Sequence, residues 1–115
     1  MVARILVAAF ILAQASSVAL AQSRPPRFWN LTKYTVKEFY LSKPGLNQWG
    51  DNQCKNDKDG TVDVDERLRL TNAPAGKYDA KLVDVSGRTC FAKDIPVADG
   101  EIFSLEERDL VGCTQ

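Results

Sequence analysis

Residues 77–97, KYDAKLVDVSGRTCFAKDIPV, decide the fold. Apolar and charged side chains alternate along the first half: Tyr78, Ala80 and Leu82 on one side, and Lys77, Asp79 and Lys81 on the other. An alternation with period two is typical of a half-buried strand. Ser86-Gly87 is a tight connection of the kind found in hairpins, and residues 88–97 return as the partner strand. The stretch therefore predicts a β-hairpin.

Upstream of the hairpin, residues 61–70 alternate in the same way, with Val62, Val64, Leu68 and Leu70 on one face. They predict a half-buried strand, in which Glu66 interrupts the apolar face and indicates a bulge or a short loop. Residues 28–42 are rich in aromatic and β-branched side chains, which favour strands over helix. Turn sequences at 44–45 (PG) and 72–76 (NAPAG) separate these segments.

Downstream, Asp99-Gly100 predicts a turn before a strand at 101–104. Ser104 and Glu107 have the spacing of a capping box, which predicts a single helical turn through Leu110. Short strands separated by turn signals, with almost no helical pattern, indicate an all-β fold. We expect a small antiparallel β-sandwich or open barrel of five to seven strands, with one short C-terminal helical turn.

The first 21 of the 115 residues have the three parts of a secretory signal: a charged start at Arg4, an apolar run at 5–12, and Ala19-Leu20-Ala21 before the cleavage site. The expected organisation is a signal peptide at 1–21, a flexible lead-in at 22–27 and one β domain at 28–115. We expect the mature protein in the periplasm or outside the cell, without stable insertion into a membrane.

The composition excludes several classes of protein. The chain has no histidine, so Ser-His-Asp and Cys-His catalysis and histidine-ligated zinc are excluded. Removal of the signal takes away only Arg4 and leaves 14 basic and 15 acidic residues. Since this chain has no general positive field, we expect no nucleic-acid partner.

Three cysteines allow three pairings and leave one thiol over. The favoured bridge is Cys90 to Cys113, because it joins a predicted strand to the C-terminal tail and closes a loop that would stabilise the fold by about 3 kcal/mol. Three states stay open for Cys54: a free thiol, a bridge between two molecules, or a bridge to Cys90 in place of Cys113.

An acidic segment at 57–66 has the spacing of a calcium loop. With Gly60 at the sharp turn, the ligands would be Asp57, Asp59, Asp63 and Glu66. Against this, Lys55 stands at the first ligand position and neither flank has a helical pattern. The alternative is a solvated turn that leads into the next strand. Calcium is the only cofactor that the sequence suggests.

Aromatic residues are concentrated at 28–49. In so small a domain they are needed to fill the core. Where they are exposed they would bind a partner protein or stack on a glycan. The candidate recognition residues are Trp29, Tyr40 and Trp49.

Three segments resemble a group of small exported bacterial proteins: residues 49–53 (WGDNQ), the hairpin at 74–90 (PAGKYDAKLVDVSGRTC) and residues 110–113 (LVGC). Members carry a WGxNQ-like segment, a PAGxYDxKLVDxxGxxC-like hairpin and a C-terminal LxxC. The resemblance implies a compact β domain outside the cytoplasm and agrees with Cys90 and Cys113 as a pair. It implies no activity.

The sequence thus favours an exported, non-enzymatic β-sandwich that acts as a binding or structural module. The alternative is a calcium-binding module that uses the 57–66 loop. A third hypothesis is a glycoside hydrolase with Asp63 and Glu66 as paired carboxylates. It is the weakest, because so short a chain has little room for a deep cleft.

Overall fold

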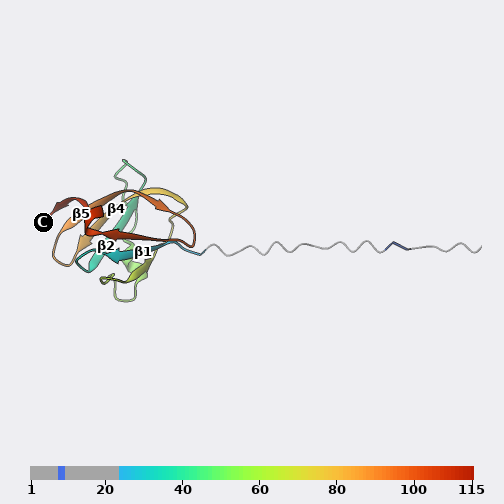
Figure 1. Ribbon diagram of the computed structural model, residues 1–115, viewed down its shortest axis with the longest axis horizontal. Helices are drawn as coiled ribbons and strands as arrows, with labels where there is room; N and C mark the ends of the chain where they lie inside the picture. The colour runs from blue at the N-terminus through green and yellow to red at the C-terminus, as the bar shows by residue number, and fades with distance from the viewer. Residues whose placement is uncertain (1–7, 10–23) are drawn as a thin grey trace, which may run out of the picture.

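The computed structural model describes residues 8–9 and 24–115 (Figure 1). The predicted signal peptide, apart from Ala8 and Ala9, and the first two residues of the lead-in lie outside this part. Among the described residues no helix is long and apolar enough to cross a membrane. The elements, in chain order, are β1 (Arg27–Leu31), β2 (Val36–Ser42), the 3-10 helix η1 (Gln53–Asn56), β3 (Arg67–Arg69), β4 (Gly76–Asp84), β5 (Thr89–Val97), β6 (Ile102–Glu106), the 3-10 helix η2 (Glu107–Asp109) and β7 (Val111–Thr114).

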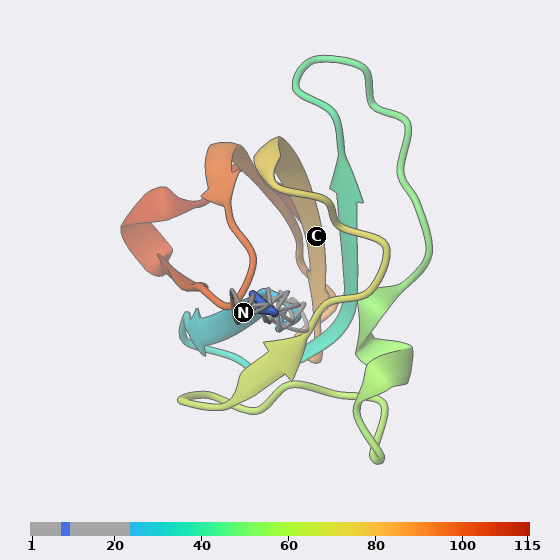
Figure 2. The ribbon, with the colours of Figure 1, turned by 90° about the vertical axis from the view of Figure 1, so that its right-hand side faces the viewer.

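The strands form two sheets that enclose one core (Figures 1 and 2). Sheet A has the order β3-β1-β6, and sheet B has the order β2-β4-β5-β7. The predicted all-β sandwich is confirmed. Every pairing is antiparallel except that of β1 with β6, which is parallel and which no sequence pattern indicated.

The predicted hairpin is β4–β5. Its register places Leu82 opposite Cys90 and Ala80 opposite Ala92, and all four side chains are buried. The connection turns at Gly87, whose φ of 88° favours glycine. Asp79 departs from the predicted alternation. It lies on the polar side of the strand but is buried, because the Gly45 and Asp94 backbone N–H groups donate to its carboxylate.

The strand expected at 61–70 is wrong in its first half. Only Arg67–Arg69 form a strand, and Val62 makes an isolated bridge with Val36. Val64, expected in the core, is 49% exposed. The chain turns at Asp65, which has a positive φ of 70°. The backbones of Asp65 and Glu66 bond to Asn30 there, so the interruption indicated by Glu66 is a turn.

The predicted C-terminal helical turn exists but begins later than expected. Ser104, the expected cap, lies inside β6, because the pairing with β1 extends that strand to Glu106. The turn is a 3-10 helix in which Glu106 is the cap residue and Asp109 accepts a hydrogen bond from its backbone N–H. A strand pairing thus displaced a local capping signal by two residues.

The predicted lead-in joins the domain before residue 28. The carbonyl of Arg24 accepts a bond from the Gly100 N–H, and that of Pro26 accepts one from the Leu70 N–H. Arg27 is the first residue of β1. These contacts continue the pairing of β1, the central strand of sheet A, with both of its neighbours beyond the end of the strand.

Phe28 and Phe39 form the centre of the core. Their rings stack with centroids 4.3 Å apart, and both are fully buried. Because Phe28 belongs to β1 and Phe39 to β2, this stack joins the two sheets. Aromatic residues of the 28–49 segment therefore supply the core, as so small a domain requires.

Candidate functional site

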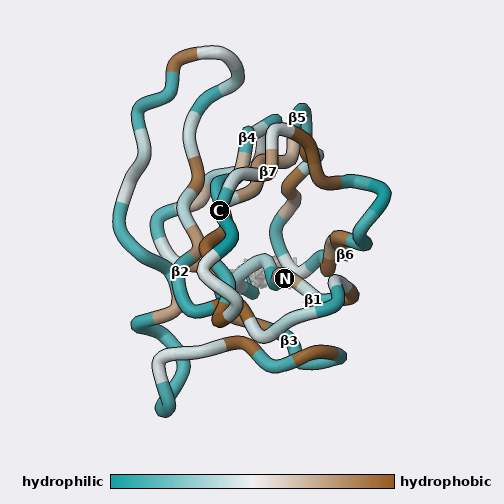
Figure 3. Tube along the Cα trace, turned by 90° about the vertical axis from the view of Figure 1, so that its left-hand side faces the viewer, coloured by the Kyte–Doolittle hydropathy of each residue, from teal (hydrophilic) through white to brown (hydrophobic). Residues whose placement is uncertain are grey.

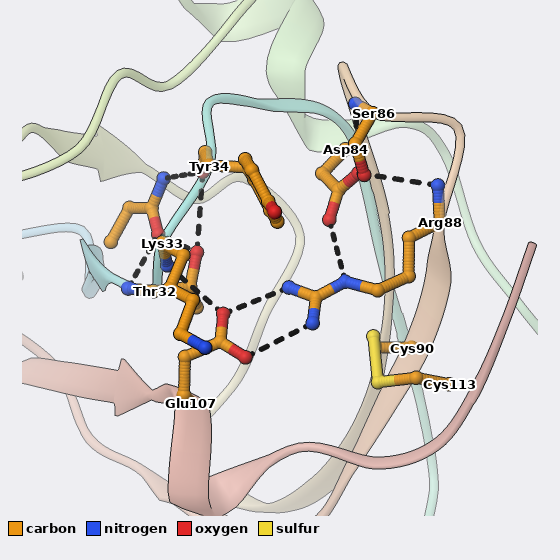
Figure 4. Close-up of polar contacts among 10 residues, drawn as sticks. Thr32, Lys33, Tyr34, Asp84, Ser86, Arg88, Cys90, Glu107 and Cys113 are labelled. Atoms are coloured by element: carbon orange, nitrogen blue, oxygen red, sulfur yellow. Dashed lines mark hydrogen bonds and ion pairs between the residues drawn. A yellow bond between two sulfur atoms is a disulfide. The ribbon is translucent and has the colours of Figure 1, made fainter.

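The predicted disulfide is confirmed: Cys90 is bonded to Cys113 (Figure 4). Cys90 lies on β5 and is 1% exposed. Cys113 lies on β7, all of whose residues are exposed. The bond therefore holds to sheet B a strand that buries little surface of its own.

Cys54 is a free, fully buried thiol, which answers the question that the sequence left open. It lies in η1, beside the Val36 carbonyl on β2. Burial, together with the nearby Asp57 and Glu38 carboxylates, raises the pKa of this thiol to about 12. It remains protonated at neutral pH and acts as a small apolar side chain.

An arginine cluster that the sequence analysis missed lies beside the disulfide (Figure 4). The Arg88 guanidinium donates to Asp84 at 2.9 Å and to both oxygens of Glu107 at 2.8 and 3.0 Å. It also lies 5.1 Å from the ring centre of Tyr34. Glu107 in turn accepts the Lys33 N–H at 2.9 Å. The cluster joins the β4–β5 hairpin to the end of β6 and to the β1–β2 connection.

The electrostatics of this cluster favour its ionised form. Burial alone would raise the pKa of Asp84, but hydrogen bonds from Ser86 and Arg88 lower it below its ordinary value. The hydrogen bonds from Arg88 likewise lower the pKa of Glu107. Because every charged group already has partners, the cluster is suited to holding the two sheets together. It leaves no carboxylate with a raised pKa to act as a general acid.

The acidic segment 57–66 forms two local turns. Asp57 accepts the Asp59 N–H at 2.8 Å. Glu66 accepts the Asp63 N–H at 2.8 Å, and Asp63 accepts the Thr35 hydroxyl. These bonds are typical of loop residues that satisfy their own backbone.

The four predicted calcium ligands are not gathered into one set. In the described part of the chain no three Asp, Glu or Cys side chains come together to hold a metal ion. Asp57 does approach Glu66. The Asp63 N–H lowers the pKa of Glu66, but burial and the neighbouring Asp57 and Asp63 carboxylates outweigh it, so the net pKa is raised.

Two of the three candidate recognition aromatics lie on the outer face of sheet B. Tyr40 is opposite Lys81, which is opposite Phe91, so these side chains form one row. Trp49 packs on Phe91 with ring centroids 5.8 Å apart. The Tyr40 hydroxyl is bonded to Glu38, which raises the pKa of the phenol to about 12. Both aromatics are half-buried.

Trp29, the third candidate, lies on the opposite side of the molecule, on the outer face of sheet A. Its indole N–H donates to Asp65 at 3.0 Å, and the Arg67 guanidinium lies 4.3 Å from its ring centre. The three aromatics therefore do not form a single site.

A groove of about 980 Å³ lies where β2 ends and β4 begins. One wall is the connection after β2, residues 43–51, which stands out beyond the sheets in Figure 2. In Figure 3 this connection is mainly hydrophilic, with one hydrophobic segment. The other wall is the turn at 71–78. No sequence pattern indicated the groove, because its two walls are far apart along the chain.

The strand pairing leaves an open edge in this groove. The pairing of β2 with β4 stops at Ser42, which is opposite Asp79. The pairing of β4 with β5 continues on to Gly76, opposite Val97. Residues 76–78 of β4 therefore have a strand on one side and the groove on the other.

Comparison with known proteins gives no assignment. The chain matches no family model, no curated protein and no solved structure.

Proposed function

We propose that this protein is an exported, non-enzymatic binding module that holds an extended segment of a partner polypeptide in the groove beside β4. The observation that supports it most is the open edge at residues 76–78, which lines the groove where β2 has ended. An unpaired strand edge next to a groove is the arrangement by which domains bind peptides through strand addition.

The backbone groups at this edge are oriented to pair with an incoming strand. Lys77 is opposite Pro96 on β5, and proline has no N–H to donate. Successive residues of a strand direct their backbone groups to alternate edges. Because Pro96 cannot donate, its pairing with Lys77 favours an orientation in which the Lys77 N–H and C=O point away from β5 and toward the groove. An incoming strand would bond to them.

The side chains around this edge suit a peptide. Leu46, Pro74 and Tyr78 offer apolar contacts, and Leu46 is 53% exposed. Lys43, Lys77 and Asp51 also line the groove and supply charges of both signs, although Asp51 is already paired with Lys55. Backbone bonding would supply affinity and these side chains specificity.

Export is part of the same proposal. It is supported by the signal-like pattern of 1–21 and by the disulfide, since oxidising compartments permit such bonds. A non-enzymatic role is supported by the absence of histidine and by an arginine cluster whose groups are fully paired.

Site-specific photo-crosslinking tests the groove. A photoreactive residue replaces Leu46 at the groove, and in a control it replaces Val85, which is similarly exposed at 56% but lies at the turn of the hairpin. We expect a discrete protein adduct in producing cells from position 46 and none from position 85.

The adduct should also depend on free space in the groove. Ala75→Trp fills the groove from an exposed position and should abolish the adduct at 46, whereas Arg108→Trp, at an exposed position of η2 outside the groove, should preserve it. Equal adducts from positions 46 and 85, or an adduct that survives Ala75→Trp, would contradict the proposal.

A further inference from the structure

The outer face of sheet A presents three arginines around one tryptophan. Phe28 and Leu68 pair with their side chains in the core. Since neighbours along a strand face opposite sides, the flanking pairs Arg27–Arg69 and Trp29–Arg67 face outward. All three arginines are exposed. We call Arg27, Arg67 and Arg69 the arginine patch.

The charges of the arginine patch are not neutralised. Arg27 and Arg69 are directly opposite each other on adjacent strands, an arrangement of like charges that destabilises a sheet. No described carboxylate lies within ion-pair distance of any of the three, whereas Arg88 is paired twice. Arg67 stacks on Trp29. However, no described carboxylate pairs with the facing Arg27 and Arg69, and this unpaired positive charge points to an anionic ligand.

Trp29 fixes the orientation of Arg67. Its indole N–H is bonded to Asp65, and the Arg67 guanidinium stacks on its ring. Stacking uses the flat face of the guanidinium and leaves the N–H groups at its edge free for bonds. Such an edge matches a carboxylate or sulfate group through two parallel hydrogen bonds.

We propose that the arginine patch binds an anionic polysaccharide, one that carries carboxylate or sulfate groups along an extended chain. Arg67 and Arg69 are two residues apart on one strand, a separation of about 7 Å. Arg27 is on the next strand, opposite Arg69 and about 5 Å from it. The charges are therefore spread over a sheet face and are not gathered in a cavity. This arrangement suits a polymer with repeated charges more than a single small anion.

The surroundings disfavour other polyanions. The chain carries 15 basic and 15 acidic residues, so it lacks the wide positive field of proteins that bind nucleic acids. Trp29 is half-buried with its N–H occupied and its ring covered by Arg67, so it is not available to insert into a bilayer. On β6, Ser104 lies beside Trp29, and Ile102, which is 40% exposed, lies beside Arg27. The vesicle arm of the test below decides whether this one side chain acts as an apolar anchor.

Fluorescence titration tests the proposal. The chain has two tryptophans, so Trp49→Phe leaves Trp29 as the sole indole reporter. The probes are heparin for sulfate and polygalacturonate for carboxylate, with dextran as the uncharged control. We expect both anionic probes, and not dextran, to change the Trp29 emission with an affinity that falls as salt is added.

Matched charge variants identify the site in the Trp49→Phe background. Arg27→Gln with Arg69→Gln should weaken binding at least about tenfold, since it removes two charge-assisted contacts. Lys37→Gln with Lys58→Gln removes the same charge from exposed positions elsewhere and should leave affinity unchanged. The arginine double variant should also unfold at the same or a higher temperature than its parent, because it relieves the like-charge pair.

Three outcomes would overturn the proposal: no response to either anionic probe at low salt, equal losses from the two double variants, or binding to anionic phospholipid vesicles without binding to the polysaccharides. The Ala75→Trp variant separates this site from the groove, because it should lose the crosslinked adduct and retain polysaccharide binding.

Discussion

The two sheets are assembled in different ways. Sheet B contains a hairpin of strands adjacent in sequence, β4–β5, and a disulfide that adds β7. Sheet A joins three strands from distant parts of the chain and includes the parallel pair β1–β6. The difference shows that this fold depends on local signals for one layer and on long-range packing for the other. Substitutions in each layer measure how far the two depend on each other.

The largest effect should come from the stack between the sheets. Phe28→Ala removes a fully buried ring of β1 that lies against Phe39 of β2, and should cost about 3–5 kcal/mol of the free energy of unfolding. Chemical denaturation measures it, with Ile102→Ala, an exposed position on the same sheet, as the control. A loss below about 1 kcal/mol would show that sheet B is stable without sheet A.

The disulfide should matter next, and mainly to sheet B. Cys113→Ser should lower the free energy of unfolding by about 3 kcal/mol, because the bond closes a loop of 23 residues. Hydrogen exchange should speed up most in β7, which buries little surface. With dithiothreitol present, wild type and variant should unfold alike. A difference that persists under reduction would mean that the cysteine contributes through its packing.

Arg88 connects the layers by charge. Arg88→Gln leaves the buried Asp84 without its guanidinium partner and should cost about 2 kcal/mol. Arg88→Lys keeps the charge but cannot bond Asp84 and Glu107 at once, so it should recover only part of the loss. Denaturation of both variants measures this. Full stability in Arg88→Lys would show that geometry is unimportant in the cluster.

Acid should weaken the protein through this cluster and through the buried Asp79. The pKa values of Asp79, Asp84 and Glu107 are lowered in the folded state from ordinary values of 3.8, 3.8 and 4.5. The unfolded chain therefore takes up protons first, so this stabilisation is complete above the ordinary values and is lost as pH falls through the lowered ones. Thermal midpoints should fall steeply in this acid range. In Arg88→Gln the decline should be shallower; an unchanged slope would remove Arg88 as its cause.

The smallest effect should be in the acidic loop, which belongs to neither sheet. Asp59→Ala, at an exposed position, should change stability by less than about 0.5 kcal/mol. Millimolar calcium added after chelation should leave the thermal midpoint where magnesium leaves it, because no three acidic side chains gather among the described residues. A rise specific to calcium would reinstate the loop as a metal site.

The parts of the fold that the sequence predicted follow the same division between local signals and long-range packing. The hairpin and its disulfide were predicted because alternation, turn residues and cysteines are local signals. The pairing of β1 with β6 was not predicted, because neither segment carries a sequence signal that identifies its partner. The displaced helical turn and the exposed Val64 arose where such a pairing, or a bond to Asn30, overrode a local pattern.

The candidate sites were harder to predict than the fold. Trp29 was identified as a recognition residue, but its arginine neighbours come from β3 and only the strand register places them beside it. The burial of Asp79 depends on backbone groups from two other segments. For the acidic loop the local pattern suggested more than the structure shows. Its spacing resembled a calcium ligand set, but the backbone does not bring the four side chains together.

The central position of β1 in sheet A has a consequence for the order in which the chain folds during synthesis. A chain that emerges N-terminus first releases β1 long before β3, and β6 appears only near the end. Sheet A cannot close until β6, residues 102–106, has left the ribosome. Topologies that rely on such distant pairings fold slowly. The order of the strands therefore delays closure of the fold, and the export proposed above would require the chain to stay unfolded over that interval.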